Sequence, residues 1–376
     1  MRGLFHQAFW IALSATATLA GAAMAMPAQT AAIVYVGNCE SNDIYVMQLD
    51  RQTGELTLIE KVPLPGIIKA GGSTPMTVSP DRRFLFVATR GEPQSVFTFA
   101  IDPASGKLKL IGSGPLTDSM PYISTDHTGR FLFAASYPGH KFTVSPIGAN
   151  GVIGPTQQVL ENQTNAHSIL PDAKNRFVLA ATLGNDLVNV LKFDAKTGRL
   201  APNTPPSVSV KAKTGPRHFV FHPKGKLVYV LGELDAAVHV FDYDPGKGQL
   251  KEKQSVGTLP PGVTGRIAAA DLQITPDGRF LYASDRTTNT LTGFKVSAPG
   301  GNSGGTLTLI ESIPTETMPR SFSIDSSGHY LFVVGMRSHR MSGYRIESGT
   351  GKLTKLKEYA MGKIPNWVQI VDLPAK

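Results

Sequence analysis

Cysteine is almost absent from this chain, in which Cys39 is the only one among 376 residues. Without a second cysteine the chain cannot form an internal disulfide, so the stability of its fold must come from packing. No basic residue adjoins Cys39 in the sequence to lower the pKa of its thiol. We therefore interpret it as a small buried residue at the end of a strand, the alternative being a nucleophile.

Several cofactor motifs are also missing. The sequence contains no C-x-x-C-H haem motif and no grouping of His and Cys with the spacing of a zinc site. These absences argue against a haem-dependent electron-transfer protein. We expect the protein to work without a metal or a cofactor.

Long stretches of helical periodicity are missing after the N-terminal region. A helical bundle or a Rossmann domain needs such stretches, so the sequence disfavours both. No linker, charge run or low-complexity break divides the chain, although its length would allow two or three domains. We expect residues 26–376 to form one domain.

Negative charge is in short supply, with 28 Asp and Glu against 37 Lys and Arg and a net charge of +9. The basic residues are scattered through turns, and no basic stripe interleaved with aromatic residues accompanies them. We therefore expect no nucleic-acid partner. We also expect a small-molecule ligand and a monomer.

Residues 1–25 have the pattern of a secretory signal peptide. Arg2 opens a short positive region, residues 8–23 are apolar and rich in small residues, and Ala23-Met24-Ala25 is an A-x-A cleavage pattern. The apolar run is too short to span a bilayer securely, although an uncleaved anchor is the alternative. We expect cleavage near Ala25, no membrane span in the mature chain, and a periplasmic or secreted location.

What the chain does contain is a unit of about fifty residues that recurs along most of its length. Its first phrase is a tight turn that leads into a strand, as in SPDRRFLFVATR (79–90), HPKGKLVYVLGE (222–233) and TPDGRFLYASDR (275–286). Its second phrase is an alternating strand followed by a polar turn that ends in Gly, as in VFTFAIDPASGKLKLI (96–111). Each unit therefore predicts four short antiparallel strands.

The repeats predict an all-β fold. Six copies carry the first phrase, and a seventh begins without its turn at Ile33. Seven four-stranded sheets cannot bury their faces alone, and a radial arrangement leaves only short edges, so we predict a seven-bladed β-propeller. The segment from Ile364 to Leu373 reads as an inner strand without a blade of its own. We expect it to complete the blade that begins at Ile33.

In a propeller, the residues before each inner strand and those after each second strand meet on one face around the central channel. The side chains there that can bind or catalyse are Tyr122, His167, Arg217, Asp271 and Arg320 before the inner strands, and Arg90, Tyr137, Glu233, Arg286 and Arg337 after the second strands. Several converging arginines predict an anionic ligand. They can also stabilise an oxyanion that forms during acyl transfer.

His167 has an intrinsic pKa of about 6.5 and is the expected proton shuttle at neutral pH. Glu233 among arginines should stay ionised, so it activates water only weakly unless it is partly desolvated. Each residue has a structural alternative. His167 could bond the backbone of its loop, and Glu233 with Arg217 could form a structural ion pair. The remaining histidines, including His218, default to structural roles.

At these residues the chain resembles a known family. The segments NAHSI, GPRHFVFHP, GELD, LYASDR and MPRSFSI are similar to the seven-bladed lactonase family, which contains the bacterial propeller-type 6-phosphogluconolactonase and the fungal 3-carboxy-cis,cis-muconate cyclase. The resemblance covers about residues 32–373. It implies metal-free lactone chemistry with catalytic His167, Arg217, Glu233 and Arg286. From the repeat positions at the channel mouth we expect substrate contacts from Arg90, Tyr122, Tyr137, Asp271, Arg320 and Arg337.

Sugar-phosphate metabolism is cytosolic, whereas the expected signal peptide would direct this chain out of the cytoplasm. This difference favours an exported relative that acts on another acidic lactone. Three alternatives stay open beside a lactonase: a non-catalytic binding or assembly propeller of the cell envelope, a muconate-lactonising enzyme, and an electron-transfer propeller. A calcium-dependent lactonase would need several oxygen ligands near the axis. Asp271, Glu233, Asn38 and Asn366 could be proposed as these ligands, but the adjacent arginines would repel the ion.

Overall fold

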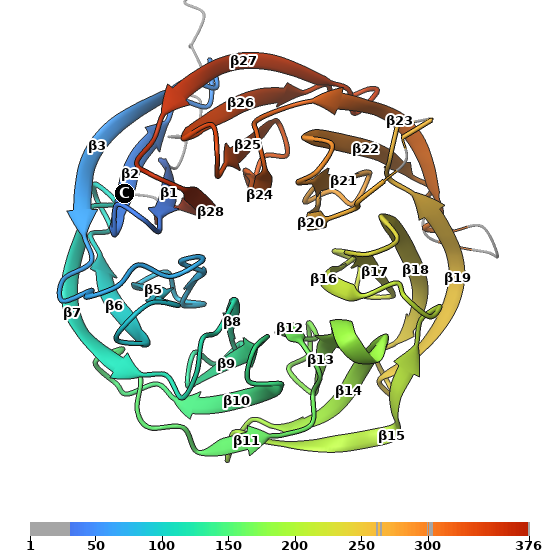
Figure 1. The fold of residues 1–376 in the computed structure, drawn as a ribbon, viewed down its shortest axis with the longest axis horizontal. Coiled ribbons are helices and arrows are strands. Elements are labelled where there is room, and N and C mark those ends of the chain that lie inside the picture. Colours follow the sequence, from blue (N-terminus) through green and yellow to red (C-terminus); the bar gives the residue numbers. More distant parts are fainter. Residues whose placement is uncertain (1–30, 261, 264, 299, 301–303, 375–376) are drawn as a thin grey trace, which may run out of the picture.

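The computed structural model describes residues 31–374 except 261, 264, 299 and 301–303. Within these ranges the strands form seven four-stranded antiparallel sheets, which stand like blades around a central axis (Figure 1). This arrangement confirms the predicted seven-bladed propeller. The expected signal peptide, residues 1–25, and the expected mature start near Met26 lie outside the described residues.

Each blade contains four strands, which follow one another from the central channel to the outer rim. Blade 1 contains β28 (Pro365–Asp372), β1 (Ala32–Asn38), β2 (Asp43–Leu49) and β3 (Leu56–Pro63); blade 2 contains β4 (Met76–Val78), β5 (Phe84–Ala88), β6 (Ser95–Ile101) and β7 (Leu108–Pro115); blade 3 contains β8 (Tyr122–Thr125), β9 (Phe131–Ser136), β10 (Lys141–Pro146) and β11 (Gln158–Leu160).

The remaining blades follow the same order. Blade 4 contains β12 (Ala166–Pro171), β13 (Phe177–Thr182), β14 (Leu187–Asp194) and β15 (Arg199–Ser209), with the short 3-10 turn η1 (Leu183–Asn185) after β13; blade 5 contains β16 (Pro216–Phe221), β17 (Leu227–Gly232), β18 (Ala237–Asp244) and β19 (Gln249–Gly257); blade 6 contains β20 (Ala269–Ile274), β21 (Phe280–Asp285), β22 (Thr290–Val296) and β23 (Leu307–Pro314); blade 7 contains β24 (Pro319–Ile324), β25 (Tyr330–Gly335), β26 (Arg340–Ile346) and β27 (Leu353–Ala360).

The ring closes through the two ends of the described chain. β28 pairs antiparallel with β1 from Ala32 opposite Asp372 to Asn38 opposite Pro365, with one irregularity near Asn38. The closure therefore occurs at the segment that the sequence predicted. Cys39, at the end of this pairing, is buried, and burial raises the pKa of its thiol to about 11. A protonated, buried thiol is a packing residue.

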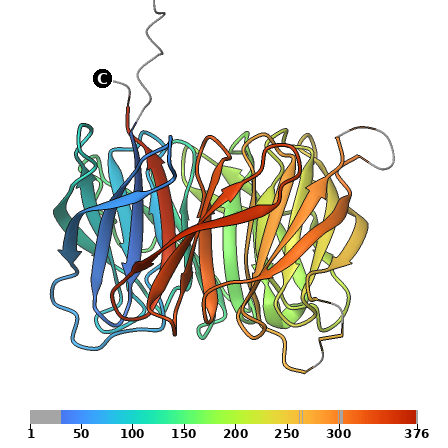
Figure 2. The same cartoon turned by 90° about the horizontal axis from the view of Figure 1, so that it is seen from above.

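The hydrophobic core lies between neighbouring blades. Each of seven buried clusters draws its residues from two adjacent blades, for example Tyr35 and Phe99 from blades 1 and 2, and Leu281 and Val240 from blades 6 and 5. Both faces of every sheet are covered in this way, and side chains of the strands can be apolar on both sides. Seen from the edge, the molecule is a disc whose strands cross its thickness (Figure 2).

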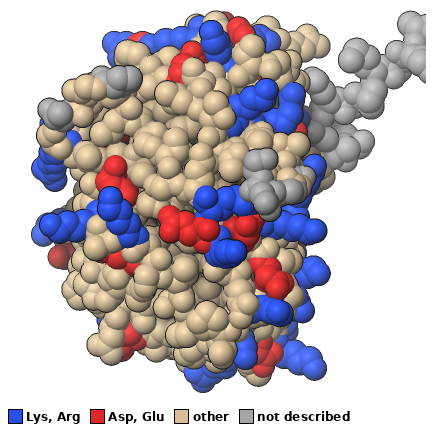
Figure 3. Space-filling view, turned by 90° about the vertical axis from the view of Figure 1, so that its right-hand side faces the viewer, with Lys and Arg blue, Asp and Glu red and all other residues tan. Residues whose placement is uncertain are grey.

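The outer rim carries the scattered charge that composition predicts. Basic and acidic side chains are interspersed over the part of the rim seen in Figure 3. Within the described ranges, none of the helical segments has the length and hydropathy that crossing a bilayer requires.

Candidate active site

Bulges in the inner strands position the candidate residues. The ladder of β12 steps from Ala166 to Ser168 and leaves out His167. The ladders of β16 and β24 omit Arg217 and Arg320 in the same way. A bulge re-aims the side chain of the unpaired residue. The same local device therefore turns one polar side chain out of each of these three blades.

A residue in the left-handed conformation lies two positions before each of the bulged residues. Asn165, Gly215 and Met318 have φ of 53°, 61° and 63°. For residues other than glycine, this left-handed conformation costs of order 1–3 kcal/mol, and such residues gather at functional sites. Gly215 adopts this conformation without strain, whereas the strain at Asn165 and Met318 indicates that the surrounding structure holds these two backbones in place.

Backbone hydrogen bonds hold the residues after the second strands on the same face of the ring. The backbone N–H of Glu233 donates to Gly215 O (2.8 Å), and that of Arg286 donates to Ala268 O (3.1 Å). Both residues are thus hydrogen-bonded to a loop that leads into an inner strand. Glu233 and Arg286 therefore reach the channel mouth beside the bulged residues.

Glu233 is held between two arginines. Arg217 Nε lies 2.8 Å from Glu233 Oε2, and Arg286 Nη2 lies 2.7 Å from Glu233 Oε1. Arg217 is fully buried and also donates through Nη1 to the carbonyl of Ala270, whereas the side chains of Arg286 and Glu233 keep 12% and 20% of their exposure. Arg286 and Glu233 can touch a ligand, and Arg217 acts from beneath them.

The arginines determine the charge of Glu233. Burial raises the pKa of this carboxyl, but the charges of Arg217 and Arg286 outweigh burial and leave the pKa below its ordinary value. Burial, together with the charge of Arg286, lowers the pKa of Arg217 to about 10. Glu233 and Arg217 are therefore ionised at neutral pH. Burial therefore does not raise the pKa of Glu233 enough to make it a strong base.

His167 is a buried, neutral imidazole on which the charges of Arg217 and Arg286 act. Burial, followed by the charges of Arg217 and His218, lowers the pKa of His167 well below 6.5. Its Nδ1 is buried and has no hydrogen-bond partner among the described residues. Its ring contacts Tyr137, with centroids 6.1 Å apart. The sequence led us to expect a ring that titrates near neutrality; in the structure it is a free base there, because three cationic side chains surround a buried site.

Two further arginines stand on the other side of the channel mouth. Arg320 is buried, and its Nη2 lies 3.4 Å from Ser73 Oγ, which Arg90 Nη1 also approaches at 3.4 Å. Arg90 Nε donates to Ser119 Oγ (2.9 Å). These arginines are fixed by hydroxyl groups, and the charge of Arg320 acts on both His167 and Glu233.

Tyr122 and Asp271 lie deeper than the sequence analysis expected. Both line a cavity of about 400 Å³ inside the channel, together with His218 and Trp367, and not the pocket beside Glu233. Asp271 Oδ1 lies 2.8 Å from His218 Nδ1, and its Oδ2 accepts the backbone N–H of Phe322 (3.1 Å). The carboxylate is thus engaged within the protein, and the structure does not bring it to the mouth.

His218 is the residue that the sequence analysis undervalued. Its ring packs against those of His167 and Tyr122, with centroids 5.2 Å apart in both pairs. The only signal in the sequence was its place directly after Arg217, where strand alternation turns it to the opposite side of the inner strand. His218 links the arginine pair to the channel and is buried with Asp271.

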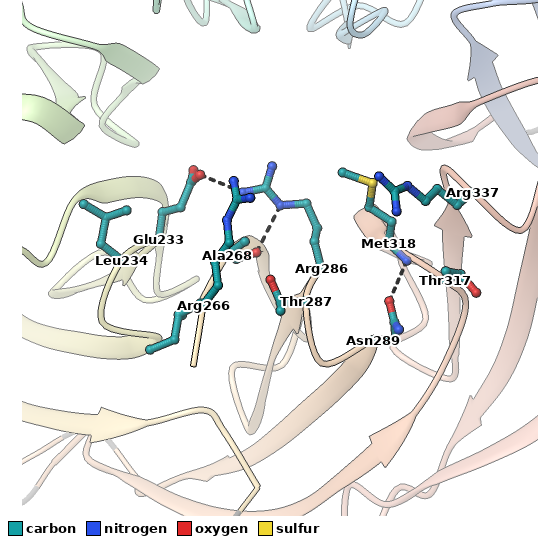
Figure 4. Close-up of a pocket in the computed structure, with 11 residues that line it drawn as sticks. Glu233, Leu234, Arg266, Ala268, Arg286, Thr287, Asn289, Thr317, Met318 and Arg337 are labelled. Carbon is teal, nitrogen blue, oxygen red and sulfur yellow. Dashed lines mark hydrogen bonds and ion pairs between the residues drawn. The ribbon is translucent and has the colours of Figure 1, made fainter. Parts of the chain in front are cut away.

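The pocket at the mouth has a volume of about 420 Å³. Glu233 and Arg286 line it on one side, and Met318 and Arg337 line it on the other (Figure 4). Arg337 is exposed and follows the second strand β25. Arg266 also lines the pocket, and no repeat position could have revealed it because it lies in the loop between β19 and β20.

No group of three or more His, Cys, Asp or Glu side chains in the described ranges is arranged to hold a metal ion. The proposed calcium ligands are engaged separately. Glu233 pairs with arginines, Asp271 with His218, and Asn366 Oδ1 accepts the backbone N–H of Thr74 at 2.8 Å. The site instead offers a neutral imidazole, a carboxylate and cationic hydrogen-bond donors, which suit the polarisation of a carbonyl and the stabilisation of an oxyanion.

Comparison with known proteins agrees with this chemistry. A family model described as a seven-bladed β-propeller lactonase matches residues 33–370. A 6-phosphogluconolactonase from Pectobacterium carotovorum is 40% identical over 341 residues, which cover 91% of this chain and 99% of the relative. One from Serratia proteamaculans is 39% identical over 339 residues, covering 90% of this chain and 98% of that protein.

A solved structure also shares the fold. The periplasmic gluconolactonase of Pseudomonas aeruginosa superposes with a TM-score of 0.81 at 26% identity, covering 92% of this chain and 100% of that one. The family model spans nearly the whole ring, and the relatives match over nearly their full length. The chain therefore belongs to the seven-bladed β-propeller lactonase family.

Proposed function

We propose that the protein hydrolyses a small sugar-type lactone that carries a phosphate or a carboxylate. The observation that supports this most directly is the pair of arginines around Glu233 beside the neutral, buried His167. The relatives named 6-phosphogluconolactonase act, by name, on such a phosphorylated lactone.

The residues divide the reaction between them. A water oxygen attacks the carbonyl carbon of the lactone, and His167 accepts the proton that the water loses. The carbonyl oxygen becomes an oxyanion, which Arg286 stabilises by a charge-assisted hydrogen bond. The ring C–O ester bond then breaks, and the proton on His167 passes to the departing oxygen. The product is an open-chain hydroxy acid.

Glu233 and Arg217 prepare this arrangement. Both carboxylate oxygens of Glu233 lie within 2.8 Å of a guanidinium nitrogen, so the carboxylate fixes Arg286 and can still accept a hydrogen bond from water at its exposed edge. Arg217, being fully buried, holds Glu233 from below. Arg217 is therefore a positioning residue in this mechanism.

A panel of lactones tests the proposal. The full-length chain, produced so that its N-terminus is processed, is assayed on 6-phosphogluconolactone, on gluconolactone and on a muconate, in the presence of a chelator. We expect hydrolysis of a sugar lactone well above the uncatalysed rate, measured beside a Glu233→Gln control. The absence of turnover on every lactone, with the fold intact, would overturn the proposal and leave a binding propeller. Cyclisation of the muconate alone would select the lactonising reaction.

We also propose that the protein works as an exported monomer in the periplasm or outside the cell. The N-terminal pattern ending at Ala25 supports export. N-terminal sequencing after cell fractionation should find a chain that begins near Met26 outside the cytoplasm, and light scattering should give the mass of one chain. An intact N-terminus in the membrane fraction would show an anchor instead.

A further inference from the structure

A second histidine lies against the base of the proposed reaction. The rings of His167 and His218 are in contact, with centroids 5.2 Å apart and planes at 61° to each other. Both side chains are buried, and His167 Nδ1 and His218 Nε2 have no hydrogen-bond partner among the described residues. Leaving a buried polar atom unpaired costs stability. Two such nitrogens in adjoining rings therefore point to a role that the packing of the fold does not explain.

The protonation of His218 follows from its contact with Asp271. The Oδ2 of Asp271 accepts the backbone N–H of Phe322 (3.1 Å), and its Oδ1 accepts that of Leu272 (2.9 Å). Burial raises the pKa of this carboxyl, but the hydrogen bonds that it accepts outweigh burial and leave the pKa below its ordinary value. An ionised carboxylate only accepts hydrogen bonds. His218 Nδ1, which lies 2.8 Å from Oδ1, therefore carries a hydrogen and donates.

The other nitrogen of His218 is consequently an acceptor. Burial, followed by the charge of Arg217, lowers the pKa of His218 to about 4, so its ring is uncharged at neutral pH. A neutral imidazole with its hydrogen on Nδ1 has a lone pair on Nε2. His167 is also neutral, and its buried Nδ1 can supply the N–H that this lone pair lacks. The two unpartnered nitrogens thus make a matched donor and acceptor.

The separation of the two rings suits such a bond. Two imidazoles joined by one N–H···N hydrogen bond of about 3 Å have centroids about 5 Å apart. The observed separation is 5.2 Å. Asp271 holds the ring of His218, whereas no described residue bonds His167 Nδ1. A turn of the His167 ring about its Cβ–Cγ bond, which leaves the packing around His218 in place, is therefore the movement that brings the donor to the acceptor.

We propose that His218, held by Asp271, accepts a hydrogen bond from His167 Nδ1 and thereby positions the imidazole that takes the proton from water. This assignment rests on the proposed function and adds a positioning residue to it. With its hydrogen on Nδ1, His167 offers the lone pair of Nε2 to the water, as a general base must. Nε2 takes the proton and later gives it to the departing oxygen. His218 and Asp271 keep their protonation throughout.

Two substitutions of His218 separate this role from a structural one. An Asn amide reaches the place of the ring's Nδ1, and a Gln amide reaches the place of its Nε2. His218→Asn therefore keeps a donor for Asp271 but removes the acceptor for His167, whereas His218→Gln keeps that acceptor and removes the donor. His222→Asn is the matched control, because His222 is also buried, directly follows β16 and bonds backbone groups.

We expect His218→Asn to lower kcat on the lactone by roughly tenfold or more at an unchanged KM. His218→Gln should restore most of this loss, although its melting temperature falls because Asp271 loses a donor. The control should leave kcat unchanged. A purely structural dyad gives the reverse order, with His218→Asn close to the wild type and His218→Gln impaired. That order, or equal activity in the two variants, would overturn the proposal.

Nitrogen NMR of the full chain with isotope-labelled histidine tests the bond without turnover. The nitrogen shifts distinguish protonated from unprotonated ring nitrogens, and spectra of His167→Asn and His218→Asn assign the two rings. Near neutral pH we expect the hydrogen on Nδ1 in both rings, and in His218→Asn a shift of His167 toward the Nε2–H form. A wild-type His167 with its hydrogen on Nε2 would overturn the proposal even if lactones are hydrolysed. The expected protonation without turnover would instead overturn the proposed function alone.

Discussion

At the scale of single residues, the site depends on a difference in burial between the two arginines that contact Glu233. Arg217 is fully buried and bonded to the Ala270 carbonyl, whereas Arg286 reaches the pocket. Both contact Glu233, so a list of contacts alone would treat them as equivalent. Burial separates their roles: one supports the fold of the site, and the other meets the ligand.

Replacing these arginines should therefore have different consequences. Arg217→Ala leaves the Ala270 carbonyl and one side of Glu233 without a partner, so the free energy of unfolding should fall by about 3 kcal/mol or more. Arg286→Ala should cost less stability but weaken product binding by roughly tenfold or more. Chemical denaturation and isothermal titration measure the two effects. A stable Arg217→Ala protein that binds normally would contradict the assignment.

The pH dependence of catalysis should reveal the burial of His167. The groups around it are Arg217, Arg286, Arg320, His218 and Tyr137. Burial and the nearby cations lower its pKa below 6.5, so the active neutral form is present above that lowered pKa and is lost as pH falls through it. We expect kcat/KM to stay flat from about pH 6 to 8 and to decline only under more acidic conditions. A midpoint near 6.5 would mean that another group carries the proton.

At the scale of the strands, a tyrosine at the same repeat position in the second strand of three blades joins that blade to the next. The hydroxyl groups of Tyr35, Tyr229 and Tyr282 donate to the carbonyls of Gly106, Gly305 and Gly351, at 2.8, 3.0 and 2.7 Å. Each acceptor lies in or beside the outer turn of the neighbouring blade. These bonds supplement the apolar contact between blades.

Tyr282→Phe should lower the free energy of unfolding by about 1 kcal/mol, because it removes one buried hydrogen bond and leaves the Gly351 carbonyl unpaired. Phe133 occupies the corresponding place in β9, so a phenylalanine ring fits this kind of position. Denaturant unfolding measures the change. An unaltered stability would show that water satisfies the carbonyl and that the tyrosine bond adds nothing.

The sequence predicted the strands and their grouping well because each repeat carries its own turn residues. It also led us to expect His167, Arg217, Glu233 and Arg286 at one mouth; in the structure Glu233 contacts both arginines, and Glu233 and Arg286 line the pocket, whereas His167 and Arg217 are buried and do not. It could not predict the degree of burial, which depends on neighbouring blades and which lowers the pKa of His167. For the same reason Asp271 was expected at the mouth, whereas His218 and two backbone N–H groups engage it inside the channel.

At the scale of the whole molecule, the ring depends on a single joint between its two ends. β28 supplies the inner strand of blade 1, and its side chains Trp367 and Val371 belong to the core shared with blade 2. Because each blade contacts only its neighbours, an open ring exposes two blade faces to solvent. The joint therefore has a larger effect on stability than its length indicates.

Deletion of residues 364–376 should abolish cooperative unfolding, because it removes β28 and uncovers both faces of the joint. Deletion of residues 374–376 alone is the control and should leave the melting curve unchanged, since β28 ends at Asp372. Calorimetry measures both proteins. A sharp, unshifted transition in the longer deletion would show that the ring does not need this closure.

The central claim is that the cluster at the mouth of this ring catalyses lactone hydrolysis. The most direct measurement is kcat on the preferred lactone for His167→Asn and Glu233→Gln, with product affinity and melting temperature measured on the same samples. The account predicts that kcat falls by roughly 10²- to 10⁴-fold while product affinity and folding are largely retained. If both variants fold and hydrolyse the lactone at rates close to the wild type, the mouth is not the active site.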